Sequence, residues 1–144
     1  MFLTKFHIRL GVIDLERSVT FYSALLNAQP TDHGPATALF DLDSPPLVLT
    51  VEHRPQRRRR ARHGPTPRQD AQATHDAKTE FCPHSRFVLI VNDPRQVGDA
   101  CVALRRAGVR LRLEDQGIDV ADPDQNSWRV RFVPSARGRI VVAA

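Results

Sequence analysis

The chain has 144 residues, 41% of them hydrophobic, which is enough for one ordinary domain or for two small halves that share a core. Its two cysteines are too few for a disulfide framework, and no apolar run approaches the ~18 residues of a membrane span. The N-terminal residues lack the charged-then-apolar pattern of a secretory signal. We therefore expect a cytoplasmic protein with no membrane partner.

The net charge of +5 is concentrated in one segment. Residues 54–70 contain seven arginines and one aspartate, a charge of +6, so the rest of the chain carries −1. The arginine run at residues 57–62 has the charge to bind nucleic-acid phosphates, but no aromatic residue is interleaved to stack on bases. We interpret the run as a solvated connector and do not expect a nucleic-acid partner.

The first third of the chain predicts a strand, a helix and further strands. Residues 5–12 alternate between apolar and polar side chains, which is typical of a half-buried strand. Asp14 is suited to cap the helix that follows, whose apolar residues recur at helical spacing to residue 28. Strands are then predicted at residues 29–33, 36–42 and 47–52.

Residues 54–83 interrupt this pattern. Arginine, proline, glutamine, alanine, histidine and threonine dominate, and such a segment buries too little apolar surface to offset its ordering entropy. We predict a long, basic, flexible connector. It divides the chain into a first module at residues 1–53, the connector at 54–83 and a second module at 84–144.

The second module repeats the order of the first. A strand at residues 85–91 precedes a helix at 93–107, whose Cys101 is expected in the core and which Gly108 is expected to end. Strands are then predicted at residues 109–113, 118–121, 128–133 and 139–142. The repeat predicts an α+β fold of two βαβββ modules whose curved sheets form a cup.

Three motifs carry a family resemblance: Asp14-Leu15-Glu16-Arg17-Ser18-Val19 followed by Phe21-Tyr22, Asp93 after the second strand pattern, and the turn at residues 122–126. With His7, they resemble the vicinal oxygen chelate superfamily, which includes glyoxalase I, bleomycin-resistance proteins and extradiol dioxygenases. The resemblance implies a cup closed within one chain or across a homodimer, and we expect a homodimer.

Residues 21–30 and 38–47 resemble the cadmium-induced and organoarsenical-lyase-like branch of that superfamily. The branch carries a cysteine pair in a loop of its second half. No such pair occurs between Leu113 and Asp122, which argues against capture of a soft metal or an arsenical by thiols.

The resemblance also implies metal ligands on the first and last strands of each module. His7 matches the first of these positions. The matching position of the second half holds Arg86, and Arg129 stands where the family places a glutamate. An arginine cannot ligate a cation, because its guanidinium is always protonated and offers no acceptor.

Two main interpretations follow. In the first, no metal cofactor is bound, and the cup holds a small anionic molecule through guanidinium groups, with His7 as an additional donor. The arginines assigned to this cup are Arg9, Arg86, Arg129 and Arg131.

In the second, the protein is a metal-dependent lyase or dioxygenase that holds a divalent iron, zinc, manganese or nickel ion at His7 and Glu52, with His84 or His53 as a further ligand. A third alternative is a non-catalytic interaction module, with solvated arginines at a sheet edge and a basic connector that docks on an acidic partner. The residues alone do not decide among the three.

Overall fold

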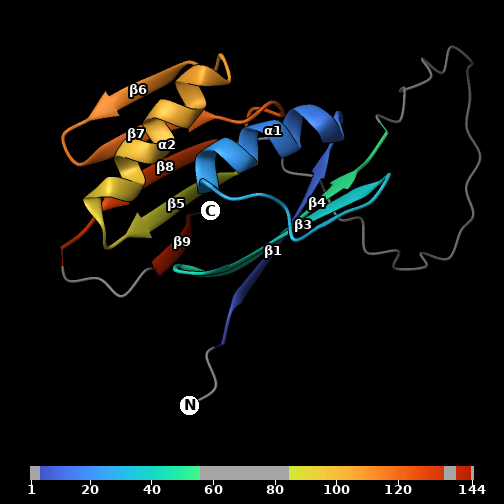
Figure 1. Ribbon diagram of the computed structural model, residues 1–144, viewed down its shortest axis with the longest axis horizontal. Helices are drawn as coiled ribbons and strands as arrows, with labels where there is room; N and C mark the ends of the chain where they lie inside the picture. Colours follow the sequence, from blue (N-terminus) through green and yellow to red (C-terminus); the bar gives the residue numbers. More distant parts are fainter. Residues whose placement is uncertain (1–3, 56–84, 135–138, 144) are drawn as a thin grey trace, which may run out of the picture.

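The computed structural model describes residues 4–55, 85–134 and 139–143. They form two modules, each with one helix over one face of a sheet (Figure 1). The first module contains β1 (Phe6–Val12), α1 (Leu15–Leu26), β2 (Asp32–His33), β3 (Thr37–Asp43) and β4 (Pro46–His53). The second contains β5 (Arg86–Val91), α2 (Pro94–Arg106), β6 (Leu111–Glu114), β7 (Gly117–Ala121), β8 (Ser127–Phe132) and β9 (Arg139–Ala143).

The two sheets have the same topology. The first has the strand order β1-β4-β3-β2, with β1 parallel to β4 and the other pairs antiparallel. The second has the order β6-β7-β8-β5-β9, with β5 parallel to β8 and β9 added beyond β5. The predicted α+β class with two βαβββ modules is therefore confirmed. The predicted connector, apart from Arg54 and Pro55, lies outside the described residues.

The helices begin where the sequence predicts and end within two residues of the predicted ends. Asp14 accepts a hydrogen bond from the backbone N–H of Arg17 at 3.1 Å, and Asp93 accepts one from Arg95 at 2.9 Å. Helix α2 ends before Gly108, whose φ of 75° is the left-handed conformation that glycine adopts most readily. Within the described residues, neither helix is long and apolar enough to cross a membrane.

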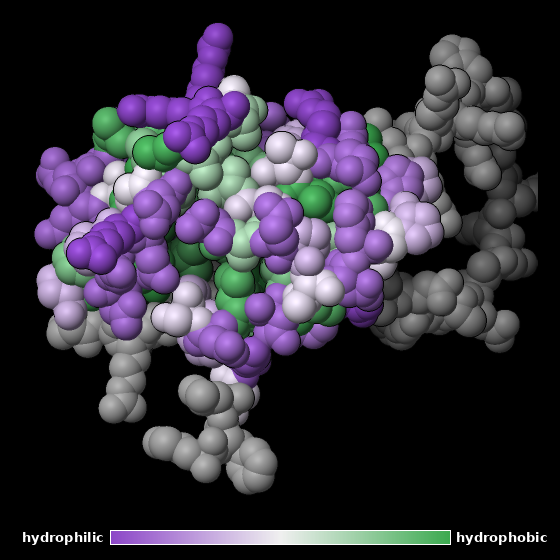
Figure 2. All heavy atoms as spheres, in the orientation of Figure 1, coloured by the Kyte–Doolittle hydropathy of each residue, from purple (hydrophilic) through white to green (hydrophobic). Residues whose placement is uncertain are grey.

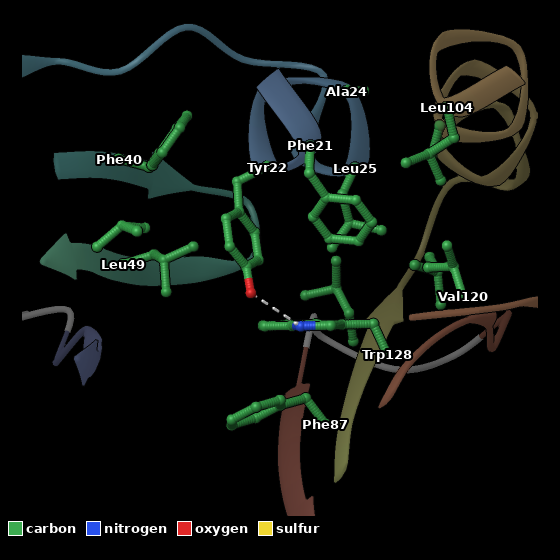
Figure 3. Packing of buried hydrophobic residues seen from close by; sticks show 14 of the residues in the cluster. Phe21, Tyr22, Ala24, Leu25, Phe40, Leu49, Phe87, Leu104, Val120 and Trp128 are labelled. Carbon is green, nitrogen blue, oxygen red and sulfur yellow. Dashed lines mark hydrogen bonds between the residues drawn. The ribbon is translucent and has the colours of Figure 1, made fainter. Parts of the chain in front are cut away.

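The two modules share one hydrophobic core. Helix α1 packs on β3 and β4 of its own sheet and also on α2 of the other module. Tyr22 points from α1 toward Trp128 of β8, which stacks on Phe87 of β5 with ring centroids 4.5 Å apart (Figure 3). Cys101 is partly buried and packs against this core, as predicted. The modules therefore fold as one unit through α1, α2 and β8.

Two glycines of the second module predict stability changes of opposite sign. Gly98 lies within α2, and a Cβ there would meet no atom within 4 Å, so Gly98→Ala is expected to stabilise the protein by about 0.5–1 kcal/mol. Gly108 has a φ of 75°, so Gly108→Ala is expected to destabilise it by about 1 kcal/mol. Urea unfolding of both variants measures the difference, and a loss of stability in Gly98→Ala would contradict the exposed helical position.

Candidate functional site

His7 lies on the face of the first sheet opposite α1, which we call the first open face. The alternate residues of β4, Leu47, Leu49 and Val51, are fully buried beneath the helix, so their neighbours point the other way. His7 lies opposite Val48 in the parallel register of β1 and β4. Its Nε2 is 2.9 Å from Oγ1 of Thr50. The imidazole therefore has a hydroxyl partner on the neighbouring strand.

Glu52 is held by two arginines at the other end of the same face. Its Oε1 lies 2.7 Å from Nη2 of Arg9, and its Oε2 lies 3.5 Å from Nη2 of Arg54. Arg54 lies over Gly11, where a Cβ would approach the arginine Cδ to 2.6 Å. Glycine at this position leaves room for the arginine side chain to lie over β1 beside the carboxylate.

The donors on this face do not fit a divalent cation. His7 and Glu52 stand four residues apart in the β1–β4 register, about 13 Å along the strands, and each has a different partner. Among the described residues, no three histidine, cysteine, aspartate or glutamate side chains are grouped to hold a metal ion. His53 is exposed at the end of β4, and His84 lies outside the described residues. Within the part of the chain that the structure describes, His7 and Glu52 are therefore not brought together.

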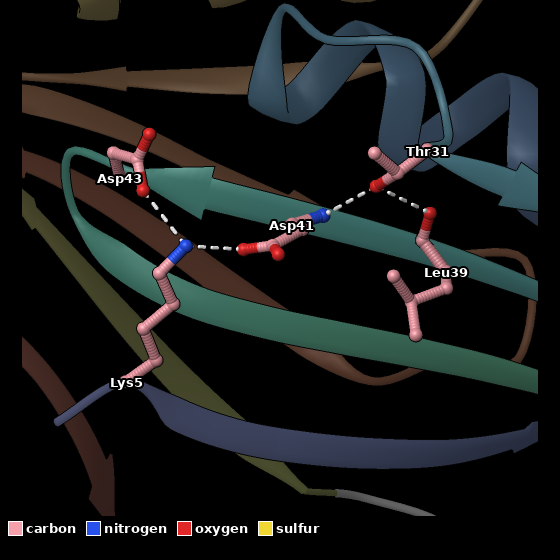
Figure 4. A network of polar contacts seen from close by, with 5 residues as sticks. All are labelled: Lys5, Thr31, Leu39, Asp41 and Asp43. Carbon is pink, nitrogen blue, oxygen red and sulfur yellow. Dashed lines mark hydrogen bonds and ion pairs between the residues drawn. The ribbon is translucent and has the colours of Figure 1, made fainter.

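The opposite end of the first open face is acidic. Nζ of Lys5 lies 2.5 Å from a carboxylate oxygen of Asp41 and 2.7 Å from one of Asp43 (Figure 4). The hydrogen bonds to these carboxylates raise the pKa of Lys5, which therefore stays charged. Oγ1 of Thr31 accepts from the backbone N–H of Asp41 and donates to the carbonyl of Leu39, which orders the edge of the sheet.

The three arginines predicted for the second module share the face of the second sheet opposite α2, which we call the second open face. Trp128 and Val130 of β8 are buried on the helix side, so Arg129 and Arg131 between and after them point away from the helix. Arg86 on β5 lies opposite Ser127 in register and shares this face.

Arg129 makes a bidentate ion pair with Asp119 of β7. Its Nε and Nη2 donate to the two carboxylate oxygens, each at 2.6 Å. These bonds, reinforced by the charges of Arg112 and Arg131, lower the pKa of Asp119. The sequence analysis missed Asp119. Residues at equal distances from the centre of a hairpin turn are paired, and Asp119 and Arg129 are equally far from the centre of the turn at residues 122–126. The spacing could therefore have predicted this pair.

A hollow of about 330 Å³ lies beside Arg131. The β6–β7 turn closes it on one side and β8 on the other, and its lining includes Glu114, Arg129 and Arg131. No described residue of the first module is part of its lining. The five predicted cup residues are therefore divided in one chain: His7 and Arg9 on the first open face, the other three on the second.

A buried polar network joins the modules behind these faces. Tyr22 donates from its hydroxyl to Oδ2 of Asp122 at 2.5 Å, and Nε1 of Trp128 donates to the Tyr22 hydroxyl at 3.2 Å. Burial, with the Asp122 carboxylate as the second cause, raises the pKa of Tyr22 well above its usual value, so the phenol stays protonated. Asn126 donates to Asp122 from both its backbone and side-chain nitrogens at 2.8 Å.

Asp124 in the same turn predicts a pH-dependent effect. Burial raises the pKa of Asp124 above 3.8, and the nearby carboxylates of Asp122 and Asp14 raise it further. The hydrogen bond that its Oδ1 accepts from the backbone N–H of Ile13 acts in the opposite direction. Its Oδ2 is buried without a hydrogen-bond partner among the described residues. A raised carboxyl pKa means that folding favours the protonated form, so stability is lost as the pH rises from about 3.8 through the folded-state pKa.

We expect Asp124→Asn to stabilise the protein at pH 7 by about 0.5 kcal/mol, because the neutral amide removes the buried charge and keeps an acceptor for Ile13. The gain should disappear below pH 3.8, where the aspartate is protonated. Thermal unfolding of both proteins between pH 3 and 7 measures it. An equal gain at every pH would contradict the electrostatic origin.

A family model described as the Glyoxalase/Bleomycin resistance protein/Dioxygenase superfamily matches residues 6–130. The chain belongs to this superfamily. It is 40% identical over 53 residues to the cadmium-induced protein CadI of Mycobacterium tuberculosis and of Mycobacterium bovis. This segment covers 37% of the chain and 35% of the relative, so the likeness spans about a third of either protein.

Solved structures of the superfamily share the fold. A putative glyoxalase from Bacillus halodurans superposes with a TM-score of 0.59 at 14% identity, covering 90% of this chain and 95% of that one. A glyoxalase/bleomycin resistance protein from Catenulispora acidiphila gives 0.56 at 20% identity, with 90% and 98% covered. The lactoylglutathione lyase from Agrobacterium tumefaciens gives 0.56 at 15% identity, with 91% and 94% covered. At these identities the likeness concerns the fold alone.

Proposed function

We propose that this superfamily member binds a small anionic molecule on the second open face and acts as a cytoplasmic binding protein. The observation that carries the proposal is the charge of this face. On the strands β5, β6, β7 and β8, arginines outnumber carboxylates on this face by four to two. The residues are Arg86, Arg112, Arg129 and Arg131 against Glu114 and Asp119.

Arg131 is the principal anion-binding group of this proposal. Arg129 is already oriented by Asp119, and Glu114 lies 3.1 Å from Nε of Arg112. Arg131 lines the hollow beside the β6–β7 turn and forms no ion pair with a described residue. A carboxylate or phosphate in this hollow accepts hydrogen bonds from its guanidinium fork and lies near Arg129.

A second copy of the chain completes the cup in this proposal. The first open face carries more carboxylates than cations among its described residues, whereas the second has the opposite balance. The charged residues of the first open face are Lys5, Arg9, Arg54, Asp32, Asp41, Asp43 and Glu52. Docking the first open face of one copy on the second open face of another pairs opposite charges and places His7 and Arg9 opposite the anion.

The metal-dependent alternative has less support, because His7 and Glu52 already have other partners and the described donors form no metal-binding group. The interaction-module alternative depends on the connector, which lies largely outside the described residues.

Anion binding is tested by calorimetric titration of the full chain with inorganic phosphate and with succinate at low ionic strength. Arg131→Gln is expected to weaken binding of the preferred anion at least tenfold, because a charge-assisted hydrogen bond is lost. Arg106→Gln, in the exposed last turn of α2, is the charge-matched control and should leave affinity unchanged. An equal loss of affinity in both variants would contradict the proposal, because binding would then depend on net charge alone. Light scattering of the same samples reports whether a dimer forms.

A further inference from the structure

The hollow beside Arg131 lies over a row of three residues on neighbouring strands. Gly117 of β7 pairs with Glu114 of β6 on one side and with Arg131 of β8 on the other, and all three line the hollow. Residues paired across strands point to the same face of a sheet, so the carboxylate and the guanidinium both belong to the second open face. Two strand spacings separate them, about 10 Å between Cα atoms.

No side chain fills the space between these two charged groups. A Cβ at Gly117 would lie 2.0 Å from the carbonyl oxygen of Val130, so any other residue would clash with the backbone of β8. The β6–β7 turn is fixed as well, because the carbonyl of Gln116 accepts a hydrogen bond from the backbone N–H of Phe132 at 2.9 Å. In Figure 2, hydrophilic side chains predominate at the end of the second module where this turn lies, at the left of the view. The fold therefore maintains a gap between a carboxylate and a guanidinium.

The next row of the same three strands has a charge in its centre. Asp119 of β7 lies between Arg112 of β6 and Arg129 of β8, and it accepts two hydrogen bonds from Arg129. The charges of this row alternate and compensate one another. In the row of Gly117 the central group is missing, and Arg131 forms no ion pair with a described residue.

The charged ends of Glu114 and Arg131 extend over the sheet. The bidentate ion pair with Asp119 raises the pKa of Arg129, and the charge of Glu114 raises it further. The hydrogen bonds from Arg129 lower the pKa of Asp119, and the charges of Arg112 and Arg131 lower it further. Exposed charges more than about 10 Å apart are largely screened, so these effects require short separations. The Glu114 side chain is also 40% exposed, so a ligand can reach its carboxylate.

We propose that the molecule bound beside Arg131 is a small zwitterion that spans the gap over Gly117. Its anionic group accepts hydrogen bonds from Arg131, and its cationic amino group donates to Glu114. A volume of about 330 Å³ holds a chain of a few carbon atoms between the two groups. This inference rests on the proposed anion binding at Arg131 and adds a group of opposite charge at the other end of the ligand.

The test compares 4-aminobutyrate with pentanoate, in which a methyl group replaces the ammonium and the chain length is unchanged. Both are titrated into the full-length protein at pH 7 and low ionic strength, and binding is followed through the backbone amide signals of Asp115 and Gly117 in 1H–15N spectra. We expect 4-aminobutyrate to bind at least threefold more tightly, the effect of one charge-assisted hydrogen bond at a partly exposed carboxylate. Equal affinities would overturn the zwitterion and leave anion binding intact.

Two variants test the role of Glu114. Glu114→Gln keeps the size of the side chain and removes its charge, so it should abolish the preference for 4-aminobutyrate without weakening pentanoate. Glu16→Gln, in the first turn of α1, removes the same charge from an exposed site and should leave the preference unchanged. A preference that persists in Glu114→Gln, or that is lost equally in Glu16→Gln, would overturn the inference.

A third variant separates this inference from the proposed function. Arg131→Gln should weaken 4-aminobutyrate and pentanoate alike, because both present a carboxylate to the guanidinium. If neither ligand binds the unmodified protein, the zwitterion is overturned, and titration with inorganic phosphate shows whether anion binding fails with it.

Discussion

Replacing Trp128 by alanine is expected to lower the free energy of unfolding by about 4 kcal/mol. Trp128 is fully buried and stands at the junction of the two modules. Its ring stacks on Phe87 at 24° and meets the edge of Tyr22 at a centroid distance of 5.6 Å. The alanine variant loses both aromatic contacts, leaves a large cavity and removes the donor to the Tyr22 hydroxyl.

Urea unfolding at pH 7 measures this loss as a shift of the midpoint with an unchanged slope. Trp128→Phe should lose less, about 1–2 kcal/mol, because it keeps the stack on Phe87 and removes the indole N–H. Leu113→Ala, at a side chain that is 62% exposed, is the matched control for apolar truncation and should change stability by less than about 0.5 kcal/mol. A loss below ~1 kcal/mol for Trp128→Ala would contradict a shared core.

The local rules of the sequence predicted most of the fold. Asp14 and Asp93 cap helices because each stands between an alternating strand and a helical apolar pattern. The same alternation placed Arg129 and Arg131 opposite Trp128 and Val130, because a strand has a side-chain period of two. These features depend on neighbours in sequence, which one chain is enough to show.

The packing between modules was not predicted. Tyr22 and Asp122 are 100 residues apart in sequence, and only the tertiary arrangement brings their oxygens to 2.5 Å. The sequence analysis treated residues 122–126 as a turn with a family resemblance, whereas the structure shows that its first aspartate bonds to α1. No period of the sequence marks such a contact, because a single buried polar residue carries no pattern.

The charges of the candidate site were predicted as residues but not as pairs. From the alternation of side chains along each strand, the sequence analysis assigned Arg9 to the same basic cup as the arginines of the second module. In the structure Arg9 lies on the first sheet and bonds to Glu52 of the same sheet, whereas Arg129 bonds to Asp119 on the second. Each acid lies on the strand next to its arginine. Strand register therefore decides which arginine at the hollow has no ion pair with a described residue, and that arginine is Arg131.

Asp122→Ala is expected to destabilise the protein by about 3 kcal/mol, although it removes a single carboxylate. The carboxylate is only 2% exposed and accepts four hydrogen bonds. The donors are the backbone nitrogens of Asp124 and Asn126, the side-chain nitrogen of Asn126 and the Tyr22 hydroxyl, all within 2.9 Å. Alanine leaves these donors without an acceptor in a site that water reaches poorly, so the cost exceeds that of one lost bond.

The measurement is thermal and urea unfolding, with Asp115→Ala in the exposed β6–β7 turn as the control for loss of an aspartate. A double-mutant cycle with Tyr22→Phe isolates the contact between the modules. Tyr22→Phe alone should cost about 2 kcal/mol, and combining it with Asp122→Ala should cost less than the sum, because both remove the same bond. Strict additivity would mean that the two groups do not interact. In that case the turn at residues 122–126 would stabilise its own hairpin and contribute nothing to joining the modules.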